Sequence, residues 1–382
     1  MSPPTIIVNK STPLAAELFS RIGPVIPLES SEITRNAVRG ADVIIVRSET
    51  RVDADLLEGS RVRFVGTVTI GTDHIDLEYL RSRRIPFVSA PGSNANSVKE
   101  YVVAALLTLS KRTGRPLQGK TIGIVGVGNV GRRVAQAVSA LGMIPLLNDP
   151  PRARAEGEQG FLSLDALMEA DIVTLHVPLT KDGPDRTHHL FDYNRIARMK
   201  PGSVLINTAR GGVVDSKALK HALSTSHLSA AVLDVWEDEP FFDEELLDLV
   251  FLGTPHIAGY SMDGKLNAVR MVFEGTCKAL NIRFPTDVRA DDRSEPERIV
   301  IPREMHDVSE IVSFAVQKAY DIAQDDASLR AVKNADRETK GRLFSSLRSE
   351  YRIRWEFSHY TAECGPEQKM AREVLLSLGF KG

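Results

Sequence analysis

The chain has 382 residues, and its 48 lysines and arginines against 50 aspartates and glutamates give a formal net charge of −2. This balance argues against a protein that coats a polyanion, and the length predicts two or three domains that each bury a core of their own. The two cysteines cannot form a disulfide framework, and no apolar run reaches the roughly 20 residues of a membrane span. We therefore expect a cytoplasmic protein that binds neither membrane nor nucleic acid.

Short apolar runs alternate with helical patterns through residues 1–260, which predicts βαβ units and two parallel sheets. The strands expected for the first sheet are 5–8, 42–46, 63–68 and 86–88, and those for the second are 121–126, 143–148, 171–176, 203–207 and 230–234. A buried helix at 98–109 is expected to join the sheets. Ser97 and Glu100 before it form a capping-box pattern, whose side chains should satisfy the first N–H groups of that helix.

The C-terminal third changes in character. A helical pattern at 263–280 could return the chain to the first sheet, and a charged, proline-containing linker follows it. The tail then contains strand-like 298–301, helical 309–322, strand-like 353–357 and helical 367–378. The predicted fold is α/β, with a Rossmann-type dinucleotide-binding domain (96–261) inserted in a flavodoxin-like parallel-sheet domain (1–95 and 262–285). A small C-terminal α+β domain (286–382) completes it.

The most specific motif is the run Gly126-Val127-Gly128-Asn129-Val130-Gly131, between an expected strand and an expected helix. Its glycines suit a tight turn, a close backbone approach to pyrophosphate, and close packing of helix on strand. Asp149 ends the next expected strand and could bind the adenosine ribose, which favours NAD over NADP; Arg152 and Arg154 weaken that preference. The alternative is a glycine turn in an ordinary βαβ unit.

Three further segments, 207–212, 234–240 and 254–259, follow expected strands and could converge at the edge of the sheet where such folds bind ligands. They contain Arg210, Glu239 and His256. Oxidation of a secondary alcohol needs a base, which an imidazole can be near neutral pH, and a neighbouring carboxylate would orient its ring. The arginine fork could hold a substrate carboxylate. A purely structural histidine is the alternative for His256.

The order of these motifs resembles the D-isomer-specific 2-hydroxyacid dehydrogenases. The resemblance implies an NAD-dependent enzyme in which Arg210 anchors the substrate, Glu239 orients the histidine and His256 is the acid/base. Segments 46–48, 64–74, 148–152, 181–184 and 257–261 resemble one branch, which oxidises 4-phospho-D-erythronate in vitamin B6 biosynthesis. Segment 320–330 resembles the dimerisation domain of that branch, which implies a homodimer.

The same resemblance implies binding residues. For the substrate they are Ser48, Thr69 and Tyr260; for the cofactor they are Gly126, Gly128, Asn129, Val130, Gly131, Asp149, Val177, Thr208, Ala209, Asp234 and Gly259. The chain departs from the pattern of the branch at Asn9, Lys10, Ser93 and Val177. The histidines show no metal-ligand spacing, so no metal is expected.

A phosphorylated substrate requires a second cation besides Arg210. Arg47, beside Ser48, is the first candidate, and Arg352 and Arg354 in the basic tail are the other candidates. A solvated helix face would also explain the basic tail, and nucleic-acid binding is a less favoured reading. An apolar face on 309–322 is expected to pair two chains. Two other functions stay open, namely a dehydrogenase for a different D-2-hydroxy acid and an NAD(H)-sensing binding protein.

Overall fold

The computed structural model describes residues 3–283 and 295–382. The chain divides into two compact units, Met1–Asn94 with Ser261–Ser294, and Ala95–Tyr260 with Glu295–Gly382. Most of the expected linker, with the expected boundary at 285/286, lies outside the described residues. None of the helices described is long and apolar enough to cross a membrane.

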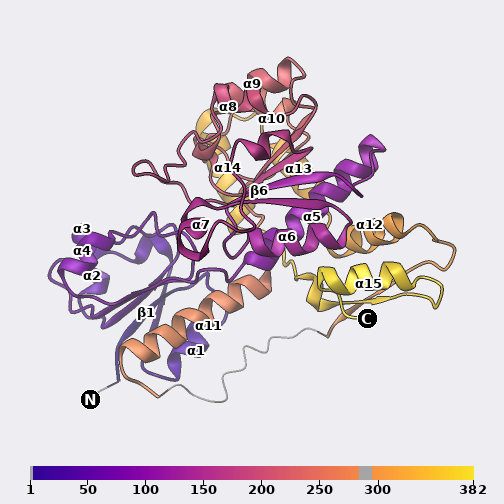
Figure 1. Cartoon of the computed structure of the whole chain (residues 1–382). Coiled ribbons are helices and arrows are strands. Elements are labelled where there is room, and N and C mark those ends of the chain that lie inside the picture. The colour runs from indigo at the N-terminus through magenta and orange to yellow at the C-terminus, as the bar shows by residue number, and fades with distance from the viewer. Residues whose placement is uncertain (1–2, 284–294) are drawn as a thin grey trace. The chain divides into compact units, whose positions relative to one another are not determined.

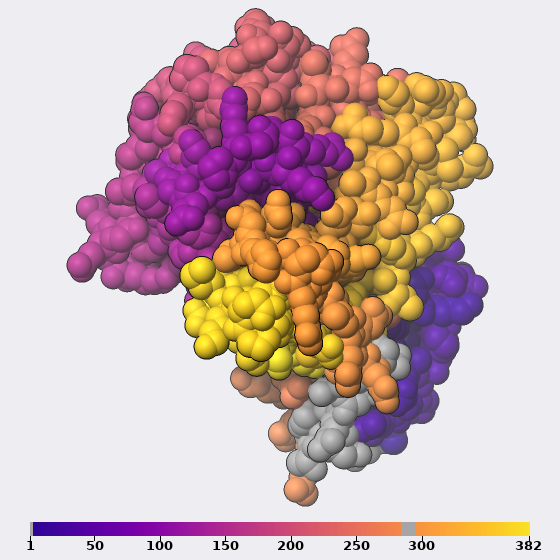
Figure 2. All heavy atoms as spheres, turned by 90° about the vertical axis from the view of Figure 1, so that its right-hand side faces the viewer, coloured from indigo at the N-terminus to yellow at the C-terminus, as the bar shows by residue number. Residues whose placement is uncertain are grey.

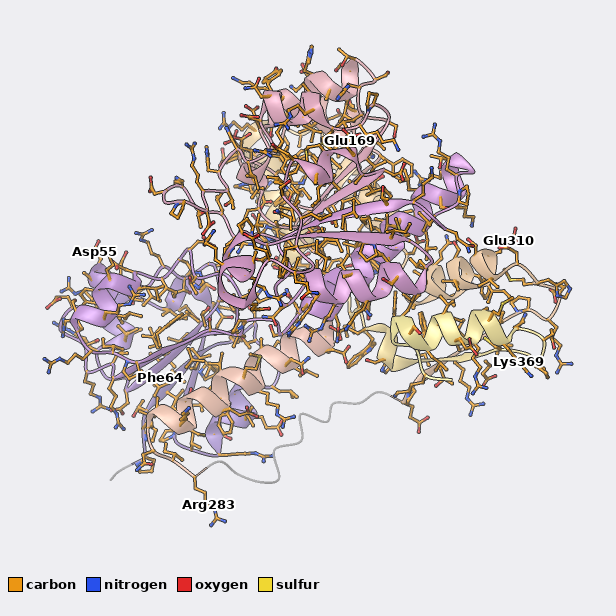
Figure 3. All side chains as sticks on the ribbon, in the orientation of Figure 1. Asp55, Phe64, Glu169, Arg283, Glu310 and Lys369 are labelled. Carbon is orange, nitrogen blue, oxygen red and sulfur yellow. The ribbon has the colours of Figure 1, made fainter. Side chains whose placement is uncertain are left out.

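The first unit contains a five-stranded parallel sheet in the order β2-β1-β3-β4-β5, which is the flavodoxin-like order predicted. Its strands are β1 (Ile6–Asn9), β2 (Val25–Leu28), β3 (Val43–Val46), β4 (Phe64–Thr67) and β5 (Phe87–Val88). Helices α1 (Ala15–Ser20) and α11 (Met262–Ala279) cover one face, and α2 (Arg35–Val38), α3 (Ala54–Leu57) and α4 (Leu77–Ser82) cover the other (Figure 1). Phe64 is fully buried in the core shared with α11 (Figure 3).

The second unit is built on a six-stranded parallel sheet in the order β11-β10-β9-β8-β6-β7. The strands are β6 (Thr121–Val125), β7 (Ile144–Asn148), β8 (Ile172–Leu175), β9 (Val204–Asn207), β10 (Ala230–Leu233) and β11 (Leu252–Gly253). The order of the strands reverses between β6 and β8, and open α/β sheets bind their ligands beyond the carboxyl ends of the strands at such a switch point. The predicted Rossmann-type sheet is thus confirmed, with β11 as an additional short edge strand.

Helices cover both faces of this sheet (Figure 1). They are α5 (Ala95–Thr113) and α6 (Gly131–Ala140) on one face, and α8 (Tyr193–Arg198), α9 (Ser216–Ser224) and α10 (Glu244–Leu249) on the other; α7 (Pro150–Glu156) follows β7. Strands buried on both faces explain why their sequences are almost continuously apolar.

The tail belongs to the same compact unit as this sheet. It consists of a parallel pair, β12 (Glu297–Val300) with β13 (Tyr360–Glu363), and helices α12 (Val308–Ala319), α13 (Ile322–Ala331), α14 (Arg337–Ser349) and α15 (Lys369–Leu378). Helix α12 packs on α5, and α15 packs on α6. Figure 2 shows the orange and yellow tail against the purple segment that contains α5. Glu310 and Lys369 point outward from α12 and α15 (Figure 3).

Two local predictions are wrong. Helix α5 begins at Ala95, so Ser97 and Glu100 are buried within it and bind other partners, not the N–H groups at its start. Residues 353–357 form no strand; the tail strand is β13, further along. The apolar alternation there misleads, because Ile353 is 70% exposed while Arg354 is 4% exposed.

Candidate active site

The glycine-rich run forms a turn between β6 and α6. Gly126 has φ +87°, and a Cβ on Gly131 would lie 2.0 Å from the carbonyl oxygen of Gly126, so helix and strand can pack only with glycine there. A Cβ at Gly128 would meet nothing within 4 Å, and no side chain caps the start of α6. This open backbone cradle at a helix N-terminus fits a pyrophosphate.

Asp149 follows β7 and caps α7. Its carboxylate accepts the backbone N–H groups of Val127 (2.8 Å) and Arg152 (3.1 Å), which fixes it beside the glycine turn and leaves lone pairs for ribose hydroxyls. The Arg152 guanidinium is bound to Glu156, at 2.6 Å, and to the carbonyl oxygen of Val127. Arg154 is paired with Asp185. Since both arginines already have acceptors, the site suits NAD better than a cofactor with a 2′-phosphate.

The end of β8 contributes a residue that the sequence reasoning missed. His176 is followed by Val177, and its Nδ1 lies 3.2 Å from the hydroxyl of Thr208, which follows β9. Burial lowers the pKa of His176 to about 3, so its imidazole is neutral at neutral pH. His176 could have been identified as a site residue from its position, because it directly follows a buried strand at the switch point of the sheet.

Arg210 lies in the loop after β9. The Asn207 side chain holds this loop, since it donates to the carbonyl of Arg210 (3.0 Å) and accepts the N–H of Ala209 (3.0 Å). Gly211 lets the loop approach the segment after β10, because a Cβ there would lie 1.9 Å from the carbonyl oxygen of Trp236. The loop of Arg210 is therefore held against the segment that leads to Glu239.

Glu239 and His256 form a direct pair. His256 Nδ1 donates to Glu239 Oε2 at 2.7 Å, and the backbone N–H of Trp236 donates to Glu239 Oε1 at 2.8 Å. Burial alone would raise the pKa of Glu239, but the charge and hydrogen bond of His256, the Trp236 N–H and the charge of Arg348 outweigh burial and lower it. The carboxylate is thus ionised at neutral pH and holds the imidazole by Nδ1, which leaves Nε2 for proton transfer.

Asp234 organises the loop that carries His256. Its buried carboxylate accepts the Thr254 hydroxyl (2.7 Å) and the N–H groups of Ile257 (2.8 Å) and Ala258 (2.9 Å). Burial raises the pKa of Asp234, although His256 and these hydrogen bonds oppose the shift. Its expected contact with the cofactor, like that of Gly259 in the same loop, stays a prediction.

The first unit brings the other expected substrate residues to neighbouring strand ends. Arg47 and Ser48 follow β3, and Thr69 follows β4, where its hydroxyl lies 2.7 Å from that of Thr67. Lys265, in the first turn of α11, was not expected: burial lowers its pKa, and the charge of Arg47 adds to that effect. Two cations that lie close enough to affect each other would both attract an anion.

The tail arginines considered for phosphate are engaged elsewhere. Arg352 is paired with Asp325, and Arg354 is buried beside Glu100. Arg348 on α14 is a further tail cation at an expected substrate residue, because its guanidinium carbon lies 5.9 Å from the ring centre of Tyr260. Tyr260 lies in the second unit, whereas Ser48 and Thr69 lie in the first.

Comparisons with known proteins identify the family of the chain. Residues 94–258 match the NAD-binding domain of the D-isomer specific 2-hydroxyacid dehydrogenases, and residues 295–379 match a domain of unknown function, DUF3410. The erythronate-4-phosphate dehydrogenase of Chromohalobacter salexigens is 44% identical over 98% of both chains. That of Salinibacter ruber is 46% identical over 93% of both chains.

Solved structures share the fold. NAD-dependent formate dehydrogenase from Staphylococcus aureus, in complex with NAD, has a TM-score of 0.61 and 27% identity over 74% of this chain and 97% of that chain. D-Lactate dehydrogenase from Aquifex aeolicus, complexed with NAD and lactic acid, has a TM-score of 0.60 and 29% identity over 72% of this chain and 95% of that chain. The chain therefore belongs to the erythronate-4-phosphate dehydrogenases, within the D-isomer specific 2-hydroxyacid dehydrogenase family.

Proposed function

We propose that the chain oxidises C2 of 4-phospho-D-erythronate to the 2-oxo acid, (R)-3-hydroxy-2-oxo-4-phosphooxybutanoate, with NAD, as a step of vitamin B6 biosynthesis. The observation that carries this proposal is the hydrogen-bonded pair of His256 and Glu239, 2.7 Å apart, next to the loop of Arg210. The relatives named erythronate-4-phosphate dehydrogenase match nearly the full length of the chain. Bound NAD would supply the hydride acceptor, held by the glycine turn and Asp149.

Each side chain of the pair has a role in this reaction. His256 Nε2 takes the proton of the C2 hydroxyl as the hydride leaves C2, and Glu239 stabilises the imidazolium that forms. Arg210 holds the carboxylate beside C2 through its planar fork. Ser48, Thr69 and Tyr260 bind the rest of the substrate, and Arg47 together with Lys265 binds its phosphate.

A turnover assay tests the function. The purified protein, given 4-phospho-D-erythronate and NAD, is expected to form NADH and the 2-oxo acid. Equal or better kcat/KM with an unphosphorylated D-2-hydroxy acid would assign it to a different substrate. Tight NAD binding without turnover of any such acid would instead favour a sensor of the cofactor.

Asp149 is expected to select NAD, because a carboxylate accepts ribose hydroxyls and repels a phosphate dianion. Asp149→Ser should lower kcat/KM for NAD roughly 10–100-fold, the effect of losing hydrogen bonds to a charged group, and should narrow the gap to NADP. The matched control is Asp55→Ser, an exposed aspartate of α3, which should change neither value. Wild-type protein that uses NADP as well as NAD would contradict the assignment.

Glu239→Gln keeps the shape of the pair and removes its charge. The low pKa of Glu239 means that wild-type protein carries this charge at neutral pH. Oxidation needs unprotonated His256 and is lost as pH falls. Since the variant disfavours the imidazolium, the acidic limb of its kcat profile for oxidation should move to lower pH, with a reduced plateau. A limb that stays in place would show that the carboxylate does not act on the histidine.

We further propose that the tail pairs two chains. The prediction that the apolar face of 309–322 pairs two chains is wrong, because Ile311, Val312 and Ala315 are buried in the core of their own chain. Other apolar side chains of the tail are exposed, namely Val300 (65%), Ile353 (70%), Met370 (68%) and Leu376 (45%). Light scattering at micromolar concentration should show a dimer, and Val300→Glu with Met370→Glu should yield monomers. A monomeric wild-type protein would refute the pairing.

A further inference from the structure

Arg354 lies between the tail and the loop that carries His256. Its guanidinium donates to the carbonyl oxygens of Ser97, at 2.8 Å, and Ala258, at 3.4 Å, and its central carbon lies 3.7 Å from the ring centre of Tyr320. Only 4% of the residue is exposed. Since Ala258 is two residues beyond His256, a charge that is costly to bury is directed at the backbone of the active-site loop.

That loop is held from two sides. The Asp234 carboxylate binds the N–H groups of Ile257 and Ala258, while the Ser97 hydroxyl, at 2.8 Å, and Arg354 donate to the carbonyl of Ala258. His256 itself has φ +58°, a left-handed conformation that few residues other than glycine adopt. Its position must therefore be imposed by what surrounds the loop, and Arg354 is part of that surround.

Glu100 links the same arginine to α5. Its Oε2 lies 3.7 Å from Arg354, and its Oε1 accepts the N–H of Phe357 at 2.9 Å. Lys99, 3.5 Å from Glu100, donates to the carbonyl of Leu378 at the end of α15. Burial raises the pKa of Glu100 to about 8, and Glu356 adds to this, although Lys99 and Arg354 oppose it. The tail is thus fixed to α5 by buried polar bonds as well as by apolar packing.

Other tail residues contact the segment on both sides of His256. The Asp326 carboxylate accepts the N–H of Gly253, directly before Thr254, at 2.8 Å. The ring of Tyr351 lies perpendicular to that of Tyr260, with their centres 5.9 Å apart, and Arg348 lies at the same ring. The segment from Gly253 to Tyr260 therefore rests on the tail at each end.

We propose that residues 295–382 act within their own chain as a positioning domain for catalysis, and that Arg354 is the positioning residue that holds the loop of His256. This inference rests on the proposed function. It gives the tail a role besides pairing two chains, and it assigns that role to a side chain that touches neither the reacting atoms nor the cofactor cradle.

Arg354→Met tests the proposal, because it keeps the length of the side chain and removes its charge and donors. With 4-phospho-D-erythronate, kcat should fall about 10–100-fold, the scale expected when a reacting group is misplaced by about 1 Å. The dissociation constant for NAD, measured by fluorescence titration, should change much less than kcat, because the glycine turn and Asp149 lie on other strands and only Gly259 of the expected cofactor residues lies in this loop. The matched control is Arg342→Met, an exposed arginine of α14, which should keep wild-type kcat.

A second variant separates positioning from folding. Arg354→Met removes one of the two cations that oppose the raised pKa of Glu100, so Arg354→Met with Glu100→Gln replaces both ionisable side chains together. This double variant should unfold cooperatively on heating, and it should still turn over slowly. With C2-deuterated substrate, its isotope effect on kcat should exceed that of wild type, because hydride transfer becomes rate-limiting. Arg354→Lys, which keeps the charge, should recover part of the rate.

The outcomes are distinct. A folded double variant with wild-type kcat would overturn the positioning role. Slow variants whose isotope effect equals that of wild type would overturn it as well. Partial unfolding cannot mimic the expected result, because it changes neither kcat per active site nor the isotope effect. Wild-type protein that does not oxidise the substrate at all would overturn the proposed function, and the positioning role with it.

Discussion

His256→Ala is expected to lower kcat for oxidation of 4-phospho-D-erythronate by roughly 10²–10⁴-fold, the usual contribution of a general base. The reason is that Nδ1 of His256 donates to Glu239, so that Nε2 is the atom of this pair that can accept the proton of the C2 hydroxyl. Binding of NAD should be retained, because the glycine turn and Asp149 hold the cofactor without this side chain. Stopped-flow measurement of NADH formation, together with a binding titration, checks both statements.

The control for this change is His221→Ala, an exposed histidine of α9, which should keep wild-type turnover. A purified, folded His256→Ala protein with near-normal kcat would show that another group takes the proton. Loss of NAD binding in step with kcat would show instead that the histidine acts through the structure of the cofactor site.

Arg47→Ala is expected to cost on the order of 2–5 kcal/mol in kcat/KM for the phosphorylated substrate, as for loss of a charged partner to a desolvated phosphate. Arg47 has 18% of its side chain exposed, and its charge acts on Lys265. Its Nη2 lies 3.4 Å from the carboxylate of Glu49, which is 46% exposed and which a phosphate would replace. Oxidation of unphosphorylated D-erythronate should change much less. The ratio of kcat/KM for the two acids, measured for both proteins, isolates the phosphate.

Arg81→Ala, an exposed arginine of α4, serves as the matched control and should leave the ratio unchanged. An equal loss on both acids after Arg47→Ala would mean that this residue supports the fold or the carboxylate end. Lys265→Ala offers an independent check, since a second cation at the same phosphate should produce the same selective loss.

Much of the fold could be read from local patterns. Strands covered on both faces can be recognised as apolar runs. The succession of β6, the glycine run and α6 is typical of a dinucleotide site and can be recognised without knowledge of the rest of the fold. The site residues follow from the same logic, because the loops after parallel strands gather at one edge of a sheet. The pairing of Glu239 with His256 needed the resemblance as well, since nothing local shows that the two loops meet.

The failures share a physical cause, which is burial decided by distant parts of the chain. Edge strand β2 was missed because half of its side chains face solvent and Pro27 interrupts its pattern. The sequence predicts a strand at 353–357, yet Arg354 and Glu356 are both buried there, and Arg354 lies beside Glu100 and donates to the carbonyl of Ala258. Ser97 likewise bonds Ala258, 161 residues away, and no local rule could show that.

The most direct test of the whole account uses 4-phospho-D-erythronate deuterated at C2. We expect the purified protein to transfer the deuterium to NAD, with one labelled, reduced cofactor formed for each 2-oxo acid. We also expect His256→Ala to lose turnover while it still binds NAD. Deuterium retained in the organic acid or released to water, or turnover without reduced NAD, would contradict the assignment of this chain as a C2 dehydrogenase.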